Sequence, residues 1–102
     1  KLKKRMRGFF KIDECGETCT VRDETTRGTI DKRVVKMHDW LKEGAEPFAA
    51  TLFGTLAQTG IGKGDIIYAE LLLRVQGEAT FATLLYVVKI GHEESSPQIT
   101  QI

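Results

Sequence analysis

Cationic and aromatic residues alternate within the segment 29–40. Alternate side chains of an extended chain project to the same side, so Lys32, Lys36 and Trp40 are expected on one face. An aromatic ring that stacks on a nucleobase contributes about 1–3 kcal/mol, and ammonium groups are attracted to phosphates with release of counterions. This spacing therefore indicates a surface suited to a polyanion that carries flat bases, such as single-stranded nucleic acid.

Further aromatic and basic residues are candidates for the same chemistry. Phe48 and Phe53 bound the next predicted strand, Arg74 lies near the end of a later one, and Lys63 lies in a glycine-rich loop. Taken singly, each ring fits a core position better and each cation fits a solvated sheet face. The candidates for a nucleic-acid-binding surface are Trp40, Phe53, Phe48, Lys32, Arg33, Lys36, Arg74 and Lys63.

No set of residues in the sequence indicates catalysis. His38 and Asp39 are neighbours in a predicted strand, so their side chains point to opposite faces and cannot act as a dyad. The glycine-rich loop is not a phosphate-binding loop of the GxxxxGK[ST] type, because Lys63 is followed by Gly64. We therefore expect a binding protein rather than an enzyme, with no cofactor.

The cysteines and histidines are too irregularly spaced for a zinc site. Cys15 and Cys19 form a CxxxC pair, and His38 and His92 lie far along the chain. These spacings match neither a zinc knuckle nor a zinc ribbon. We expect two reduced thiols and no bound metal.

The length and charge favour one small domain with an uneven surface. The chain has 102 residues and a net charge of +1, enough for a single core. Cations nevertheless gather near the start, with no acidic residue among them, at Lys1, Lys3, Lys4, Arg5, Arg7 and Lys11. This basic arm would attract a polyanion, or it forms a solvated and partly frayed terminus.

No membrane span or export signal is apparent in the sequence. A spanning helix needs about 18 or more consecutive apolar residues, and no such run occurs. A basic start followed by an apolar core and a small-residue cleavage site is also missing. We expect a cytoplasmic protein without membrane contact.

The segment 49–75 organises the predicted fold. An apolar strand ends at Gly54, and the residues 55–59 fit a short helical turn. Gly60, Gly62 and Gly64 are expected to supply positive φ angles for a tight return. From residue 65 the chain alternates, with one apolar face, as a strand with one buried side does. That face comprises Ile67, Ala69, Leu71, Leu73 and Val75.

The other predicted strands cover residues 6–13, 17–22, 29–40 and 79–90. The last of them is apolar on both faces, which suggests a barrel wall on one side and a subunit partner on the other. Five or six strands with one short helix between the third and fourth are typical of an OB-fold. We therefore predict an all-β, five- to six-stranded Greek-key barrel over residues 1–91, followed by a short flexible tail at 92–102.

An ordered set of short motifs resembles bacterial single-stranded DNA-binding protein. The set comprises LFGTLAQ at 52–58, KGD at 63–65, IYAE at 67–70 and LR at 73–74. Weaker matches are VR at 21–22 and Trp40, and the resemblance covers about residues 6–90. It implies an OB-fold, assembly into dimers or tetramers, and binding of single-stranded DNA with little sequence preference. It also implies base stacking at Trp40 and Phe53 and a cationic contact at Arg74.

The chain departs from this family at several positions. Where the family often has a tryptophan followed two residues later by a basic residue, this chain has Pro47, Phe48 and Ala49, and Thr55 replaces a lysine. The hairpin at 76–78 is also shorter than the one that wraps DNA in the family. Two functions are therefore expected as alternatives. One is single-stranded DNA binding in replication, recombination or repair, with proteins of these processes as further partners. The other is an OB-fold protein-interaction module, such as a primosomal accessory subunit, with weak or no DNA binding.

Overall fold

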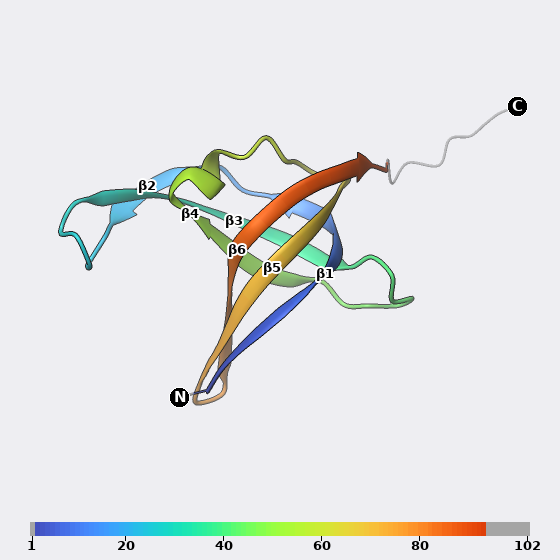
Figure 1. The fold of residues 1–102 in the computed structure, drawn as a ribbon, viewed down its shortest axis with the longest axis horizontal. Helices are drawn as coiled ribbons and strands as arrows, with labels where there is room; N and C mark the ends of the chain where they lie inside the picture. The colour runs from blue at the N-terminus through green and yellow to red at the C-terminus, as the bar shows by residue number, and fades with distance from the viewer. Residues whose placement is uncertain (1, 94–102) are drawn as a thin grey trace, which may run out of the picture.

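The computed structural model describes residues 2–93. Strands and one short 3-10 helix follow one another along the chain (Figure 1). Their bounds are β1 Leu2–Cys15, β2 Cys19–Arg22, β3 Thr29–Asp39, β4 Phe48–Phe53, η1 Gly54–Gln58, β5 Asp65–Gln76 and β6 Ala79–His92. None of the helical segments in this part of the chain is long and apolar enough to cross a membrane.

The strands close into a barrel. Their order is β1-β5-β6-β4-β3-β2, and an additional pairing of β1 with β3 closes the ring of five strands. All pairs are antiparallel except β4 and β6, which meet in parallel at Thr51 and Thr83. The short strand β2 extends the sheet beyond β3. This all-β barrel, with η1 between β4 and β5, confirms the predicted OB-fold.

Alternating side chains of the strands fill the barrel. The inner face of β5 includes Ile67, Ala69 and Leu71, which are fully buried, as the alternation predicted. Met37 from β3 and Leu52 from β4 join them in the same core. Burial of such side chains supplies the main driving force for a domain of this size.

The basic start of the chain is a strand and not a frayed arm. β1 begins at Leu2, four residues before the predicted strand, because its first half pairs with β5 from Leu2 opposite Val75 onward. Together with the β5–β6 hairpin it forms a three-stranded arm, made of residues 2–7, 72–76 and 79–83. In Figure 1 this arm projects from the barrel beside the N-terminus.

The loop around η1 differs in detail from the prediction. The helical turn is a 3-10 helix that begins at Gly54, with φ of 67°. Of the loop glycines only Gly64 has a positive φ, at 91°, so the prediction was wrong for Gly60 and Gly62. Gly64 is also required for space, because a Cβ there would lie 2.9 Å from Cε1 of the His92 ring.

Hydrogen bonds connect the end of β6 to the start of β5. Nδ1 of His92 lies 2.7 Å from Oδ1 of the buried Asp65. The backbone N–H of Glu93 donates to the carbonyl of Gly64 at 2.7 Å. Residues 92 and 93, which were predicted to begin the tail, therefore belong to the barrel, and the rest of the predicted tail lies outside the described residues.

Acidification is expected to destabilise the fold through Asp65. Burial raises the pKa of this carboxyl. Hydrogen bonds from His92, the backbone N–H of Gly62 and Lys89 together lower the pKa by more than burial raises it, so the pKa lies below its usual value. A carboxyl of this kind contributes stability that is present above its unfolded pKa and is lost as the pH falls through its folded pKa. The free energy of unfolding should therefore decrease below about pH 4.

Urea unfolding of the native protein and of Asp65→Asn, between about pH 2.5 and pH 7, measures this contribution. The variant should be less stable at neutral pH and should depend less on pH in the acid range. Glu43→Gln, which alters an exposed loop carboxylate, is the control. Equal acid dependence in Asp65→Asn and the native protein would contradict the prediction.

Candidate nucleic-acid interface

A groove of about 290 Å³ lies where the outer face of β3 and β4 meets the three-stranded arm. Its lining combines two cations, two aromatic rings and small hydroxyl residues. They are Lys32, Thr51, Phe53, Arg74, Thr80, Phe81 and Thr83. The groove thus joins three of the residues that the sequence predicted for DNA contact, namely Lys32, Phe53 and Arg74.

Strand register brings the cations beside the rings. Directly paired residues of antiparallel strands project from the same face, and Lys32 of β3 pairs with Phe53 of β4. In the arm, Arg74 of β5 pairs with Phe81 of β6. The sheet therefore presents two cation–aromatic pairs to one groove.

Both rings are available to a ligand. Phe53 is 38% exposed and Phe81 is 47% exposed, although residues of this type are usually buried. A base stacked on either ring would place its phosphates close to the ammonium of Lys32 or the guanidinium of Arg74. The groove therefore has the chemistry of a single-stranded nucleic-acid site, in which stacking and cations act together.

Lys36 lies at the edge of this groove. It pairs with Ala49, which lines the groove, and it projects from the same face as Lys32 about 13 Å along β3. Its side chain is exposed. Lys36 can therefore contact a strand of nucleic acid that continues out of the groove over β3.

Trp40 and Lys63 lie at a distance from the groove. Trp40 follows the end of β3, about 26 Å along the strand from Lys32, with 39% of its surface exposed. Its backbone N–H donates to the carbonyl of Phe9 at 2.9 Å. Lys63 lies in the turn before β5, and the strand from Asp65 to Arg74 alone spans about 30 Å. Either residue would contact only a ligand that extends well beyond the groove.

Arg33 faces the opposite side of β3. Its guanidinium donates to the carbonyls of Gly16 at 2.9 Å, Thr59 at 3.1 Å and Ile61 at 3.0 Å. These carbonyls belong to two separate loops, one after β1 and one after η1. Arg33 therefore stabilises the barrel by connecting these two loops. The sequence predicted that Arg33 contacts the nucleic acid, but its side chain does not line the groove.

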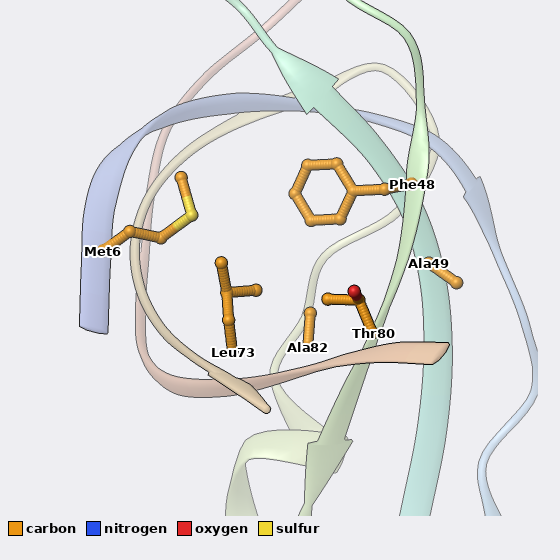
Figure 2. A pocket seen from close by; sticks show the side chains of 6 residues that line it. All are labelled: Met6, Phe48, Ala49, Leu73, Thr80 and Ala82. Carbon is orange, nitrogen blue, oxygen red and sulfur yellow. The ribbon is translucent and has the colours of Figure 1, made fainter. Parts of the chain in front are cut away.

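Phe48 also faces the interior and not the groove. Its ring packs edge-on against Phe10 with 5.8 Å between centroids, and it lies against the core. Beside it is a second groove of about 400 Å³. Figure 2 shows its lining, which is mostly apolar and comprises Met6, Phe48, Ala49, Leu73, Thr80 and Ala82. The two grooves are neighbours, because both are lined by Ala49, Thr80 and Ala82.

Phe81 is the residue of the groove that the sequence reading missed. The sequence predicts only that the strand at 79–90 is apolar on both faces, which does not single out Phe81. The tight turn at Gly77 and Glu78 pairs Gln76 with Ala79, which in turn sets Phe81 opposite Arg74. Counting residues outward from this turn along both strands would have placed the ring of Phe81 beside the guanidinium of Arg74.

Other polar groups form local contacts. His38 lies 2.8 Å from Oδ2 of Asp13, at a bulge in β1, instead of pairing with Asp39. Burial raises the pKa of the Cys15 thiol although Arg33 counteracts it, and Cys15 and Cys19 are both free thiols. Within residues 2–93 no group of three or more His, Cys, Asp or Glu residues is arranged to hold a metal ion.

The barrel and its connections define an OB-fold domain. Neither a protein-family model nor a curated protein matches the sequence. Among solved structures, the second OB-fold domain of replication protein A from Methanococcus maripaludis is similar, with a TM-score of 0.68 and 13% identity over 95% of this chain and 89% of that one. The protein priB from Ralstonia solanacearum is similar with a TM-score of 0.55 and 13% identity, over 84% of this chain and 97% of that one.

These similarities establish the fold, which is the OB-fold that the sequence resemblance implied. At 13% identity they carry no site residues from one protein to another. Membership of the bacterial single-stranded DNA-binding protein family remains a prediction from the motifs.

Proposed function

We propose that this protein is a binding protein for single-stranded DNA with little sequence preference, acting in replication, recombination or repair. The observation that carries the proposal is the groove in which Lys32 and Phe53 of the barrel meet Arg74 and Phe81 of the arm. Stacking accepts any base, because every base has a flat face, while the cations contact the phosphates. Neither interaction reads the sequence of the strand.

Titration with an oligo-dT of about 35 nucleotides tests this function, since that length exceeds the roughly 4–16 nucleotides bound by one OB-fold. Fluorescence anisotropy of the labelled oligonucleotide reports binding, and Trp40 emission reports whether the strand reaches the far end of β3. We expect binding that weakens steeply with salt, because counterions are released. No change in anisotropy at low salt would contradict the proposal.

A protein-interaction module is the second candidate function. It is favoured by the apolar groove beside Phe48, whose lining of Met6, Leu73 and Ala82 suits an apolar side chain of a protein partner. This function predicts weak or no response to oligo-dT and a stable complex with another protein. The same titration therefore distinguishes the two candidates.

We further propose that the protein forms a homo-oligomer through the outer face of β6. Tyr86 packs edge-on against Tyr68, and Tyr68 against Phe9, so aromatic rings cross three strands. The same strand also exposes large apolar side chains, which are Leu85, Val88 and Ile90. Exposed apolar surface of this kind is typical of association sites.

Light scattering should give the mass of a dimer or tetramer for the native protein. Tyr86→Lys should shift the equilibrium toward the monomer, because it places a charge at the centre of the patch. A monomeric native protein at micromolar concentration would contradict this proposal.

A further inference from the structure

We propose that the outer face of β1 extends the DNA-binding groove as a track for phosphates, formed by Lys3 and Arg5. This inference rests on the proposed function of the groove. It assigns a ligand to two cations of the N-terminal segment, which belong to a strand and have fixed positions relative to the groove.

The register of three strands places Lys3 in line with the groove. Lys3 pairs with Arg74 across β1 and β5, and Arg74 pairs with Phe81 across β5 and β6. All three side chains therefore project from one face in a single row. With neighbouring strands about 4.8 Å apart, the backbone of Lys3 lies roughly 5 Å beyond that of Arg74, which itself lines the groove.

Arg5 occupies the next row along the arm. It pairs with Leu72, and Leu72 pairs with Thr83, which also lines the groove. Lys3 and Arg5 are both exposed, and neither row contains an acidic residue. Glu70 of the following row lines one hollow with Arg5 and Arg7, but it pairs directly only with Arg7. A DNA strand that leaves the groove over Arg74 therefore meets two further cations.

The third row differs in charge. Arg7 pairs with Glu70, and Glu70 pairs with Tyr86. The carboxylate of Glu70 beside the Arg7 guanidinium weakens the attraction of Arg7 for phosphate, because opposite charges at neighbouring positions of a sheet face pair with each other. Lys4 and Met6 project from the other face of the arm. The track therefore comprises Lys3 and Arg5 and ends before Arg7.

The test compares two lengths of labelled oligo-dT, about 4 and about 16 nucleotides, which lie at the two ends of the range for one OB-fold. The variant is Lys3→Gln/Arg5→Gln. The matched control, Arg7→Gln/Arg27→Gln, removes the same charge from the third row and from the β2–β3 turn. Affinities are measured for each protein by anisotropy over a series of salt concentrations.

The shorter oligonucleotide has few phosphates to place outside the groove, so its affinity should differ less between the native protein and the variant than the affinity of the longer one. The longer one should bind the variant about tenfold more weakly at about 50 mM salt. Its salt slope should be smaller by about 1.4, because each phosphate contact on a single strand contributes about 0.7. The control should change both affinities by less than about threefold.

Four results would overturn the track. Equal losses of affinity for both oligonucleotide lengths, or an equal loss of affinity in the control, would mean that the cations of β1 act only through their total charge. No loss for either length would mean that the DNA leaves the groove by another path, while the function of the groove would stand. If the native protein bound neither oligonucleotide, the function of the groove would fail and the track with it.

Discussion

Replacing Phe53 by alanine is expected to weaken binding of oligo-dT about tenfold. Truncating a ring on which a base stacks costs about 1–3 kcal/mol, and about 1.4 kcal/mol corresponds to a factor of ten. Phe81→Ala should have a similar effect, since both rings line one groove and are exposed to a similar degree. The double variant should lose about 100-fold when the two rings stack different bases.

Conservative variants separate stacking from a general loss of structure. Phe53→Trp keeps a ring at the same position and should retain the affinity, whereas Phe53→Leu keeps the apolar bulk and should lose it. Because 38% of Phe53 is exposed, the alanine variant should keep most of its unfolding free energy, which urea titration measures. Native affinity in Phe53→Ala and in the double variant would exclude the rings as platforms for the bases.

The sequence predicted the barrel because its strands alternate clearly. The inner face of β5, with Ile67, Ala69 and Leu71, could be read directly from the spacing of apolar residues. The start of β1 could not, because charged residues such as Lys3 and Arg5 lack a local β pattern. They become strand residues only through pairing with β5, and such pairing is a tertiary effect.

The candidate site was predictable in composition and less so in arrangement. Lys32, Phe53 and Arg74 meet as proposed, although they come from three strands. Which face a residue occupies depends on register, and this placed Phe48 in the interior although its residue type suits either environment. The distance to Trp40 follows from the length of β3, and the sequence does not show where along that strand a ligand would bind.

Arg33→Met is expected to lower the free energy of unfolding by about 2–4 kcal/mol. The guanidinium satisfies the carbonyls of Gly16, Thr59 and Ile61, and methionine has no donor to replace it. Leaving partly buried acceptors without a donor costs about 1–3 kcal/mol each, less where water can enter. Urea unfolding followed by circular dichroism measures the loss.

Arg33→Lys distinguishes bracing from DNA contact, because it keeps the positive charge and removes the planar group of donors. A single ammonium cannot reach carbonyls of two loops in the directions that the guanidinium does, so this variant should lose nearly as much stability as Arg33→Met. Under conditions where both variants are folded, both should bind oligo-dT with native affinity and an unchanged salt slope. The opposite pattern would show that Arg33 contacts the DNA and does not stabilise the barrel. In that case both variants would have native stability, and the salt slope would be reduced by about 0.7 in Arg33→Met alone.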